Sequence, residues 1–232
     1  VSVSGILTAA QEKVGGVVAV ASGGVAVGDI ISSGGIEIVS AGGSASEETV
    51  ESGGTLIVLN GATVSGTVDS GGTVVSSGEV FFNSAGQPVS ATNAPLSGVV
   101  LEGEGSSALV LSGGGMVSAT VGSDTTLEVT SGGIVAGTVV SGTLTLDDGA
   151  GASVTALLDG GMETIGSSAM DAFSIIGEDG FQNVTKGGVA GSAHVLSDGT
   201  QSVYGTATGT VVEGGSQYVY GTADSTVIGE GG

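Results

Sequence analysis

The sequence has no cysteine, no arginine and no tryptophan, and only two prolines among its 232 residues. Without cysteine the fold can use neither disulfide bonds nor thiolate metal sites. Aromatic residues make up 3% of the chain, which disfavours a thick globular core or an antiparallel sandwich, since both bury aromatic side chains. No apolar run approaches the about 20 residues that a membrane-spanning helix needs.

Positive charge is almost as scarce. The chain has two lysines, Lys13 and Lys186, and 23 acidic residues, so its formal net charge is −21. Nucleic acids and anionic membrane surfaces are therefore excluded as partners, because both are bound through clustered Lys and Arg. We expect the chain to be soluble and to repel its own copies unless cations screen the carboxylates.

Glycine is abundant, with 48 residues, and it is periodic. Gly-Gly pairs begin at Gly15, Gly23, Gly34, Gly42 and Gly53, so that intervals of 8 and 11 alternate and sum to 19. A single Gly61 and a pair from Gly71 continue the series, and from Gly23 onward an aliphatic residue stands three positions before each of these turns: Val20, Ile31, Val39, Val50, Val58 and Val68. Near the C-terminus QSVYGTATGTVV returns as QYVYGTADSTVI at a spacing of 16. A flexible Gly/Ser linker would not carry this phased aliphatic pattern.

The spacing predicts an all-β fold, a parallel β-helix (β-solenoid) that forms a single repeat domain over residues 1–232. We expect each arm to be one short strand followed by one Gly-rich corner, and each coil to rise about 4.8 Å along the stack. A 19-residue coil cannot bury its own apolar face, so the aliphatic residues should form inward columns between stacked coils. Each end of the chain falls inside the pattern, and we expect the chain to be part of a longer protein.

Two stretches lose the pattern, residues 78–110 and 162–186. They contain all four phenylalanines (Phe81, Phe82, Phe173 and Phe181) and both prolines (Pro88 and Pro95). We interpret them as non-repeat insertions, either side loops or caps that cover a coil. The alternative is a pair of patches for partner binding or self-association.

Three acidic pairs are the candidates for chemistry: Glu102/Glu104, Asp147/Asp148 and Glu178/Asp179. Two placed carboxylates suffice for glycoside hydrolysis, but the chain has no tryptophan to stack on a sugar and no arginine to hold an acidic one. His194 has no second histidine or cysteine as a partner for nucleophilic catalysis. We therefore expect no enzyme activity and no catalytic residue.

The same sequence predicts no cofactor and no dedicated metal site. Ca²⁺ takes carboxylate and carbonyl oxygens as ligands, but the nonapeptide of calcium-binding solenoids is missing in register. We expect the acidic pairs to be solvated, with at most weak Ca²⁺ binding. Glu47, Glu48 and Glu51 lie beside a corner and are expected to point outward as solubilising residues.

The repeats resemble those in the passenger domains of AIDA-type autotransporter adhesins. The resemblance rests on segments such as SAGGSASEETVESGGTLIV, which starts at Ser40, with Gly-Gly at alternating arm lengths and T-V-x-S-G-G closing a coil. It covers most of residues 14–78, 111–161 and 187–232. In that family the repeats form a β-helical stalk outside the cell that serves adhesion, autoaggregation and biofilm formation, and some members carry sugars on Ser or Thr.

The resemblance implies a secreted or cell-surface structural protein, a stalk or a filament former. The expected partners are further copies of the chain, host or neighbouring cell surfaces, and glycans, with no membrane insertion by this segment. The alternative, from a different functional class, is a tailspike-like β-helix that binds or processes carbohydrate. An acidic groove rimmed by aromatic residues would favour this alternative, whereas a smooth Ser/Thr surface would favour the adhesin.

Overall fold

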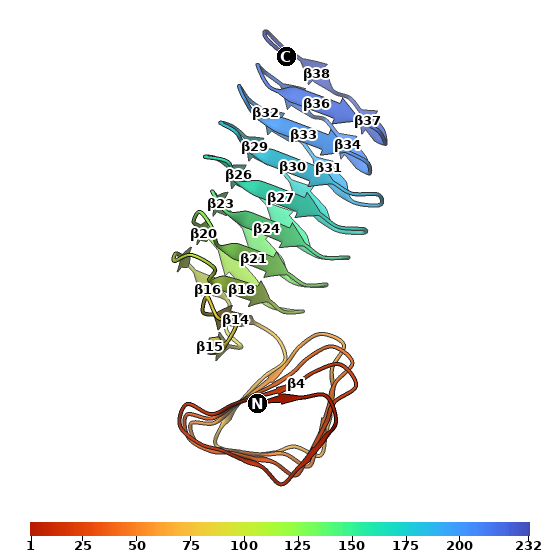
Figure 1. The fold of residues 1–232 in the computed structure, drawn as a ribbon. Helices are drawn as coiled ribbons and strands as arrows, with labels where there is room; N and C mark the ends of the chain where they lie inside the picture. Colours follow the sequence, from red (N-terminus) through yellow and green to blue (C-terminus); the bar gives the residue numbers. More distant parts are fainter. The chain divides into compact units, whose positions relative to one another are not determined.

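The computed structural model describes residues 1–232, which form strands joined by turns and bends, without any helix (Figure 1). Accordingly, no helix that could cross a membrane is present. Where a single domain was expected, the chain divides into two compact units, residues 1–77 with 91–93 and residues 78–90 with 94–232. Each unit is built from stacked coils with parallel strand pairing, so the predicted parallel β-solenoid is confirmed.

The first unit has three parallel sheets, and each coil contributes one strand to each of them. The first sheet contains β1 (Ser2–Val3), β4 (Val17–Val20), β7 (Ile36–Val39), β10 (Thr55–Val58) and β13 (Thr73–Val75). The second contains β2 (Ile6–Thr8), β5 (Val25–Val27), β8 (Ser44–Ser46) and β11 (Thr63–Ser65). The third contains β3 (Gln11–Glu12), β6 (Ile30–Ile31), β9 (Thr49–Glu51) and β12 (Val68–Ser70).

The second unit repeats this three-sided plan with longer stacks, and Figure 1 shows their strands in succession from β18 to β36. The first sheet contains β15 (Pro88–Thr92), β14 (Glu79–Phe82), β18 (Ser107–Val110), β21 (Thr126–Val129), β24 (Thr143–Leu146), β27 (Met162–Ile165), β30 (Phe181–Val184), β33 (Thr200–Val203) and β36 (Ser216–Val219). The second contains β16 (Leu96–Ser97), β19 (Gly115–Val117), β22 (Ile134–Ala136), β25 (Gly151–Ser153), β28 (Met170–Ala172), β31 (Val189–Gly191), β34 (Thr206–Thr208) and β37 (Thr222–Asp224). The third contains β17 (Val100–Leu101), β20 (Thr120–Val121), β23 (Val139–Val140), β26 (Ala156–Leu157), β29 (Ile175–Ile176), β32 (His194–Val195), β35 (Val211–Val212) and β38 (Val227–Ile228).

Each coil therefore has three strands and three corners, where the sequence predicted two arms with one strand each. The longer arm contains two short strands separated by a corner that lacks a glycine pair. In several coils a non-glycine residue takes a positive φ there, among them Glu47 (62°), Ser118 (56°), Val154 (55°) and Phe173 (65°). This left-handed conformation is rare for a residue with a side chain, and other coils use a single glycine there, such as Gly28 (69°) or Gly137 (64°). Because the third corner has no recurring Gly-Gly pair, the spacing of the pairs did not reveal it.

The expected inward columns are present, with one shift of register. Val20, Ile31, Val39 and Val50 have no exposed surface, as predicted. Val58 is only half-buried.

The predicted inward position of Val68 is wrong, because its exposed fraction is 54%. The prediction counts three residues back from Gly71, but β12 keeps the 19-residue spacing, so that Val68 pairs with Thr49 and Asp69 pairs with Val50. The coil is one residue shorter only after β12, where Thr55 pairs with Thr73. A one-residue shift moves a strand side chain to the opposite face, which places Val68 in solvent.

Residues 162–186 are not an insertion. β27 and β30 continue the first sheet in register, with Met162 paired to Thr143 and Phe181 paired to Met162. The inward positions of these coils include Glu163, Asp171 and Gln182, all of which are buried. Because polar side chains stand at these inward positions, the aliphatic repeat is hard to recognise in the sequence, although the strand pairing continues from coil to coil.

Only part of the other expected insertion, residues 78–110, leaves the coil pattern. From β16 onward the chain already follows the coils, whereas β14 runs antiparallel to β18 and pairs Glu79 with Val110. Phe81 packs against the hydrophobic core of the second unit. β14 therefore covers the edge of β18, as the interpretation of this stretch as a cap predicts.

Candidate functional site

The interior of the first unit contains four acidic side chains. Glu12 is 4% exposed, and Asp29, Glu37 and Glu48 have no exposed surface. Each occupies a position that the register assigns to the inside of the coil. Glu12 pairs with the buried Ile31, and Glu37 pairs with Val18 and Leu56, which are also buried.

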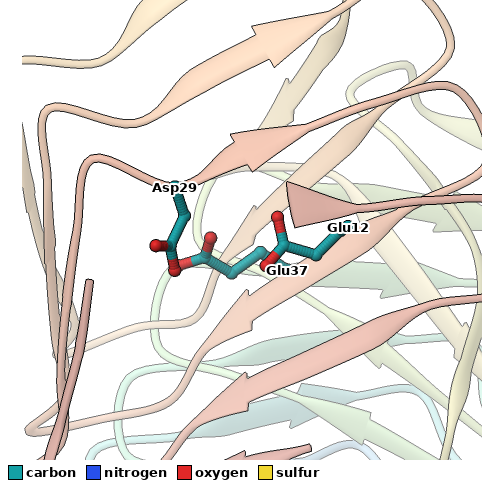
Figure 2. A group of neighbouring side chains, drawn as sticks. All are labelled: Glu12, Asp29 and Glu37. Carbon is teal, nitrogen blue, oxygen red and sulfur yellow. The ribbon is translucent and has the colours of Figure 1, made fainter. Parts of the chain in front are cut away.

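Three of these carboxylates face one another. Figure 2 shows Glu12, Asp29 and Glu37 with their carboxylate groups turned together, and one oxygen from each lies within 4.8 Å of the others. Neither carboxylate oxygen of Glu12 or of Glu37 has a hydrogen-bond partner, and Oδ2 of Asp29 has none. A buried carboxylate normally has partners for its oxygens, so five such oxygens without partners make this cluster unusual.

The backbone satisfies the remaining oxygens. The Ala10 amide donates to Oδ1 of Asp29 at 2.7 Å. The Asp29 amide donates to Oε2 of Glu48 at 2.8 Å, and the Ser46 amide donates to Oε1 of Glu48 at 3.2 Å. Asp29 and Glu48 thus form a ladder along one column with a spacing of 19 residues, and each oxygen of Glu48 accepts one backbone amide.

The pKa values of all four carboxyl groups are raised. Burial raises the pKa of Glu37 to about 8, and the charges of Glu48, Glu12 and Asp29 add to this rise. Burial also raises the pKa of Glu48 to about 7, although its bonds from backbone amides oppose the rise. The pKa values of Glu12 and Asp29 are raised for the same first reason. No lysine acts on any of these groups, so the cluster must hold protons or a bound cation to limit its charge.

The second unit buries a different polar network, in which each acid has at least one hydrogen-bond partner, although Oε1 of Glu163 has none. Oε2 of Glu163 accepts a hydrogen bond from Nε2 of Gln182 at 2.7 Å, and Oδ2 of Asp171 accepts one from the Ser174 hydroxyl. Burial raises the pKa of Glu163 and of Asp171. Nε2 of Gln201 donates to Oε1 of Gln182 at 2.6 Å and extends the network into the next coil.

The residues named from the sequence lie elsewhere. Of the three acidic pairs, five members are exposed and Asp147 is half-buried. Glu47 and Glu51 are exposed, as predicted, but Glu48 is fully buried, so its predicted outward position is wrong. The positive φ of Glu47 turns the chain directly before Glu48 and directs its side chain inward.

His194 is exposed on β32 and lines a shallow cavity of about 280 Å³ in the second unit. The other lining residues are Phe173, Ile175, Ser192 and Leu196. No carboxylate lines this cavity, so it lacks the acidic pair that a glycosidase needs.

A solved structure resembles this chain. It is the crystal structure of a hyper-glycosylated fragment of TibA, residues 55–350, whose glycosylation was catalysed by TibC. The two chains are 30% identical, the match covers 100% of this chain and 89% of the other, and the TM-score is 0.48. No family model and no curated protein matches. The fold assignment above rests on the strand pairing within each unit.

The aliphatic pattern of the sequence does not reveal the buried acids, because they stand at inward positions without sharing its residue type. Alignment of the coils at 19-residue steps places Glu12 in the column of Ile31 and Val50, and Asp29 in the column of Glu48. An acid in a column of buried aliphatic residues is the signal that could have identified the cluster.

Proposed function

We propose that this chain is a structural and adhesive β-solenoid of a bacterial surface, acting outside the cell as a stalk or filament component in adhesion, autoaggregation or biofilm formation. The observation that carries this proposal is the parallel ladder of each unit, in which outward positions recur from coil to coil. One such outward column of the second unit contains, in successive coils, Thr126, Thr143, Met162, Phe181, Thr200 and Ser216. A surface that repeats its contacts binds through multivalency, in which many weak contacts add.

The proposal includes the absence of enzyme activity. The exposed acidic pairs lie on corners, and the buried acids of the first unit lie in the coil interior, where a polysaccharide cannot reach them. We expect no release of reducing ends from neutral or acidic polysaccharides at any metal concentration. Activity that rises with protein concentration and is lost in Glu178→Gln/Asp179→Asn would contradict this part of the proposal.

The adhesive function can be tested with beads. The purified chain, coupled to fluorescent beads, should clump them and attach them to bacterial or epithelial cells, whereas an unfolded acidic protein of equal charge should not. Because each copy has a formal charge of −21, added salt should strengthen the clumping by screening the repulsion. Beads that behave like the control at every ionic strength would contradict an adhesive role.

A second candidate function is carbohydrate recognition, favoured by the exposed tyrosines of the second unit. Tyr204 and Tyr220 lie in successive coils with ring centroids 4.8 Å apart and an interplanar angle of 12°. Their exposed fractions are 52% and 66%, and Tyr218 is similarly exposed. A glycan array would test this function: binding that is lost in Tyr204→Ala/Tyr220→Ala supports it, and an array without any bound glycan contradicts it.

A further inference from the structure

The first unit contains a group of acids that its structural role does not require. Glu12 and Glu37 occupy inward positions that hold aliphatic residues in neighbouring coils, and apolar residues at these positions would stabilise the stack without any desolvation cost. Buried charges are otherwise found paired or bound to metals. We propose that Glu12, Asp29 and Glu37 bind one Ca²⁺ ion inside the first unit.

Glu37 points to a ligand independently of the clustering. Its side chain has no exposed surface, and neither of its carboxylate oxygens has a hydrogen-bond partner. Figure 2 shows that its carboxylate lies between those of Glu12 and Asp29. An unpartnered buried carboxylate that faces two others has the arrangement of a cation ligand.

The number and type of oxygens suit a hard cation. Glu12 and Glu37 offer two free oxygens each and Asp29 offers one, whereas both oxygens of Glu48 already accept backbone amides. Glu48 is not among the clustered residues, but its charge acts on Glu37 and adds to the negative charge around the site. With oxygens only, and no histidine or cysteine, the site favours Ca²⁺ or Mg²⁺ over transition metals.

The coordination preferences of the two ions favour Ca²⁺ over Mg²⁺. Calcium–oxygen distances of roughly 2.3–2.6 Å allow two ligands on opposite sides of the ion to stand up to about 5 Å apart. The ligand oxygens here lie within 4.8 Å of one another, so they can surround Ca²⁺ with little movement. Mg²⁺ requires near-ideal octahedral geometry at about 2.0–2.1 Å and gives up its water ligands reluctantly, which suits a cluster of three buried carboxylates less well.

A route for the ion exists on the side of Glu12. A cavity of about 320 Å³ borders this residue, and Val1, Leu7 and Ala10 are among the other residues that line it. The cavity is large enough for several water molecules, which can complete the six to eight ligands that Ca²⁺ takes. Lys13 also lines the cavity but is exposed.

Calorimetry on the full chain tests the proposal. The protein is refolded from urea after treatment with EDTA, so that a slowly exchanging ion does not mask the site, and is then titrated with CaCl₂. We expect one Ca²⁺ per chain, at least roughly tenfold weaker binding of Mg²⁺, and increased hydrogen-exchange protection of residues 10–48. Glu37→Gln keeps the shape of the side chain and should weaken Ca²⁺ binding at least tenfold.

The matched control is Glu102→Gln/Glu104→Gln, which removes an exposed acidic pair and should leave the binding unchanged. If Glu37→Gln fails to fold, Glu12→Gln, next to the cavity, replaces it with the same expectation. Eu³⁺ luminescence lifetimes give a second reading: a buried site predicts few bound waters, and a surface site predicts many. A folded wild-type chain that binds neither ion shows that the carboxyls are held neutral by protons and overturns the proposal. Ca²⁺ binding that survives Glu37→Gln and Glu12→Gln also overturns it, because the ions are then bound by surface carboxylates.

Discussion

The buried glutamine ladder of the second unit gives a prediction whose size follows from the structure. Gln201 donates to Oε1 of Gln182 at 2.6 Å, and its own Oε1 accepts from Nε2 of Gln217 at 2.7 Å. We predict that Gln201→Leu destabilises the second unit although it adds apolar surface to the interior. Leucine fits the site, because Leu144 and Leu127 occupy the same column three and four coils earlier along the chain and are fully buried.

The magnitude follows from the atoms left without partners. Gln182 is fully buried, and its amide nitrogen is held by Glu163 at 2.7 Å and by the Ser174 hydroxyl at 2.9 Å, so the side chain cannot turn to find a new donor for its oxygen. An unsatisfied buried acceptor costs about 1–3 kcal/mol. Gln217 is only half-buried, and water can replace its lost acceptor. We expect the free energy of unfolding to fall by about 2 kcal/mol.

Urea denaturation followed by tyrosine fluorescence measures this change, because all three tyrosines of the chain, Tyr204, Tyr218 and Tyr220, lie in the second unit. The slope of the unfolding free energy against urea should stay constant, so that the shift of the midpoint reports stability alone. Gln87→Leu, at an exposed position of the same unit, is the control and should change stability by less than about 0.5 kcal/mol. If Gln201→Leu were as stable as the wild type or more stable, the hydrogen-bonded ladder could not be what holds these side chains in the interior.

Three further predictions concern the register, the buried acids and the corners. Val50→Asp should unfold the first unit, because it buries a charge at a cost of several kcal/mol, while Val68→Asp should be tolerated in solvent; equal protease resistance of the two variants would contradict the shifted register. Burial raises the folded-state pKa of Glu163, so above about pH 4.5 the folded second unit binds more protons than the unfolded chain. The stability of this unit should therefore be greatest below about pH 4.5 and fall as the pH rises through the raised pKa. Glu163→Gln should flatten this pH dependence in urea titrations, and an unchanged profile would refute the role of Glu163. Gly161→Ala should lower the melting temperature measured by circular dichroism, because its Cβ would collide with the carbonyl oxygen of Val140, whereas Gly151→Ala meets only ordinary contacts and should melt like the wild type.

The sequence was sufficient to predict the solenoid, because in most coils the Gly-Gly corners and the phased aliphatic residues carry the same period. Val20, Ile31, Val39 and Val50 form inward columns for the reason given from the sequence, the burial of an apolar face between coils. Val68 is the exception: its coil loses one residue in the corner after β12, so counting back from that corner assigns the strand to the wrong face, and spacing alone does not say where a coil loses a residue.

The polar interior could not be read in the same way. Glu48 appeared to belong to an exposed corner because Glu47 and Glu51 flank it at short range, yet the positive φ of Glu47 turns it inside. Residues 162–186 appeared irregular for a related reason: Glu163 and Gln182 stand where Leu144 stands in an earlier coil, although the strands stay paired in register. Such replacements depend on partners in neighbouring coils, which local patterns do not reveal.

A disulfide cross-link tests the central claim, that the chain forms coils stacked in parallel register. The sequence has no cysteine, so a pair can be introduced without competing thiols. Thr126 of β21 and Thr143 of β24 are register partners, and neighbouring strands lie about 4.8 Å apart, within the range that a disulfide can bridge. Thr145 lies two residues further along β24, which places its Cα about 8 Å from that of Thr126 and outside that range. The account predicts that mild oxidation links Thr126→Cys/Thr143→Cys within one chain, seen as the loss of two hydrogen atoms by mass spectrometry, and leaves Thr126→Cys/Thr145→Cys reduced. Equal linkage of the two pairs, or linkage of the second pair alone, would contradict the register and with it the solenoid.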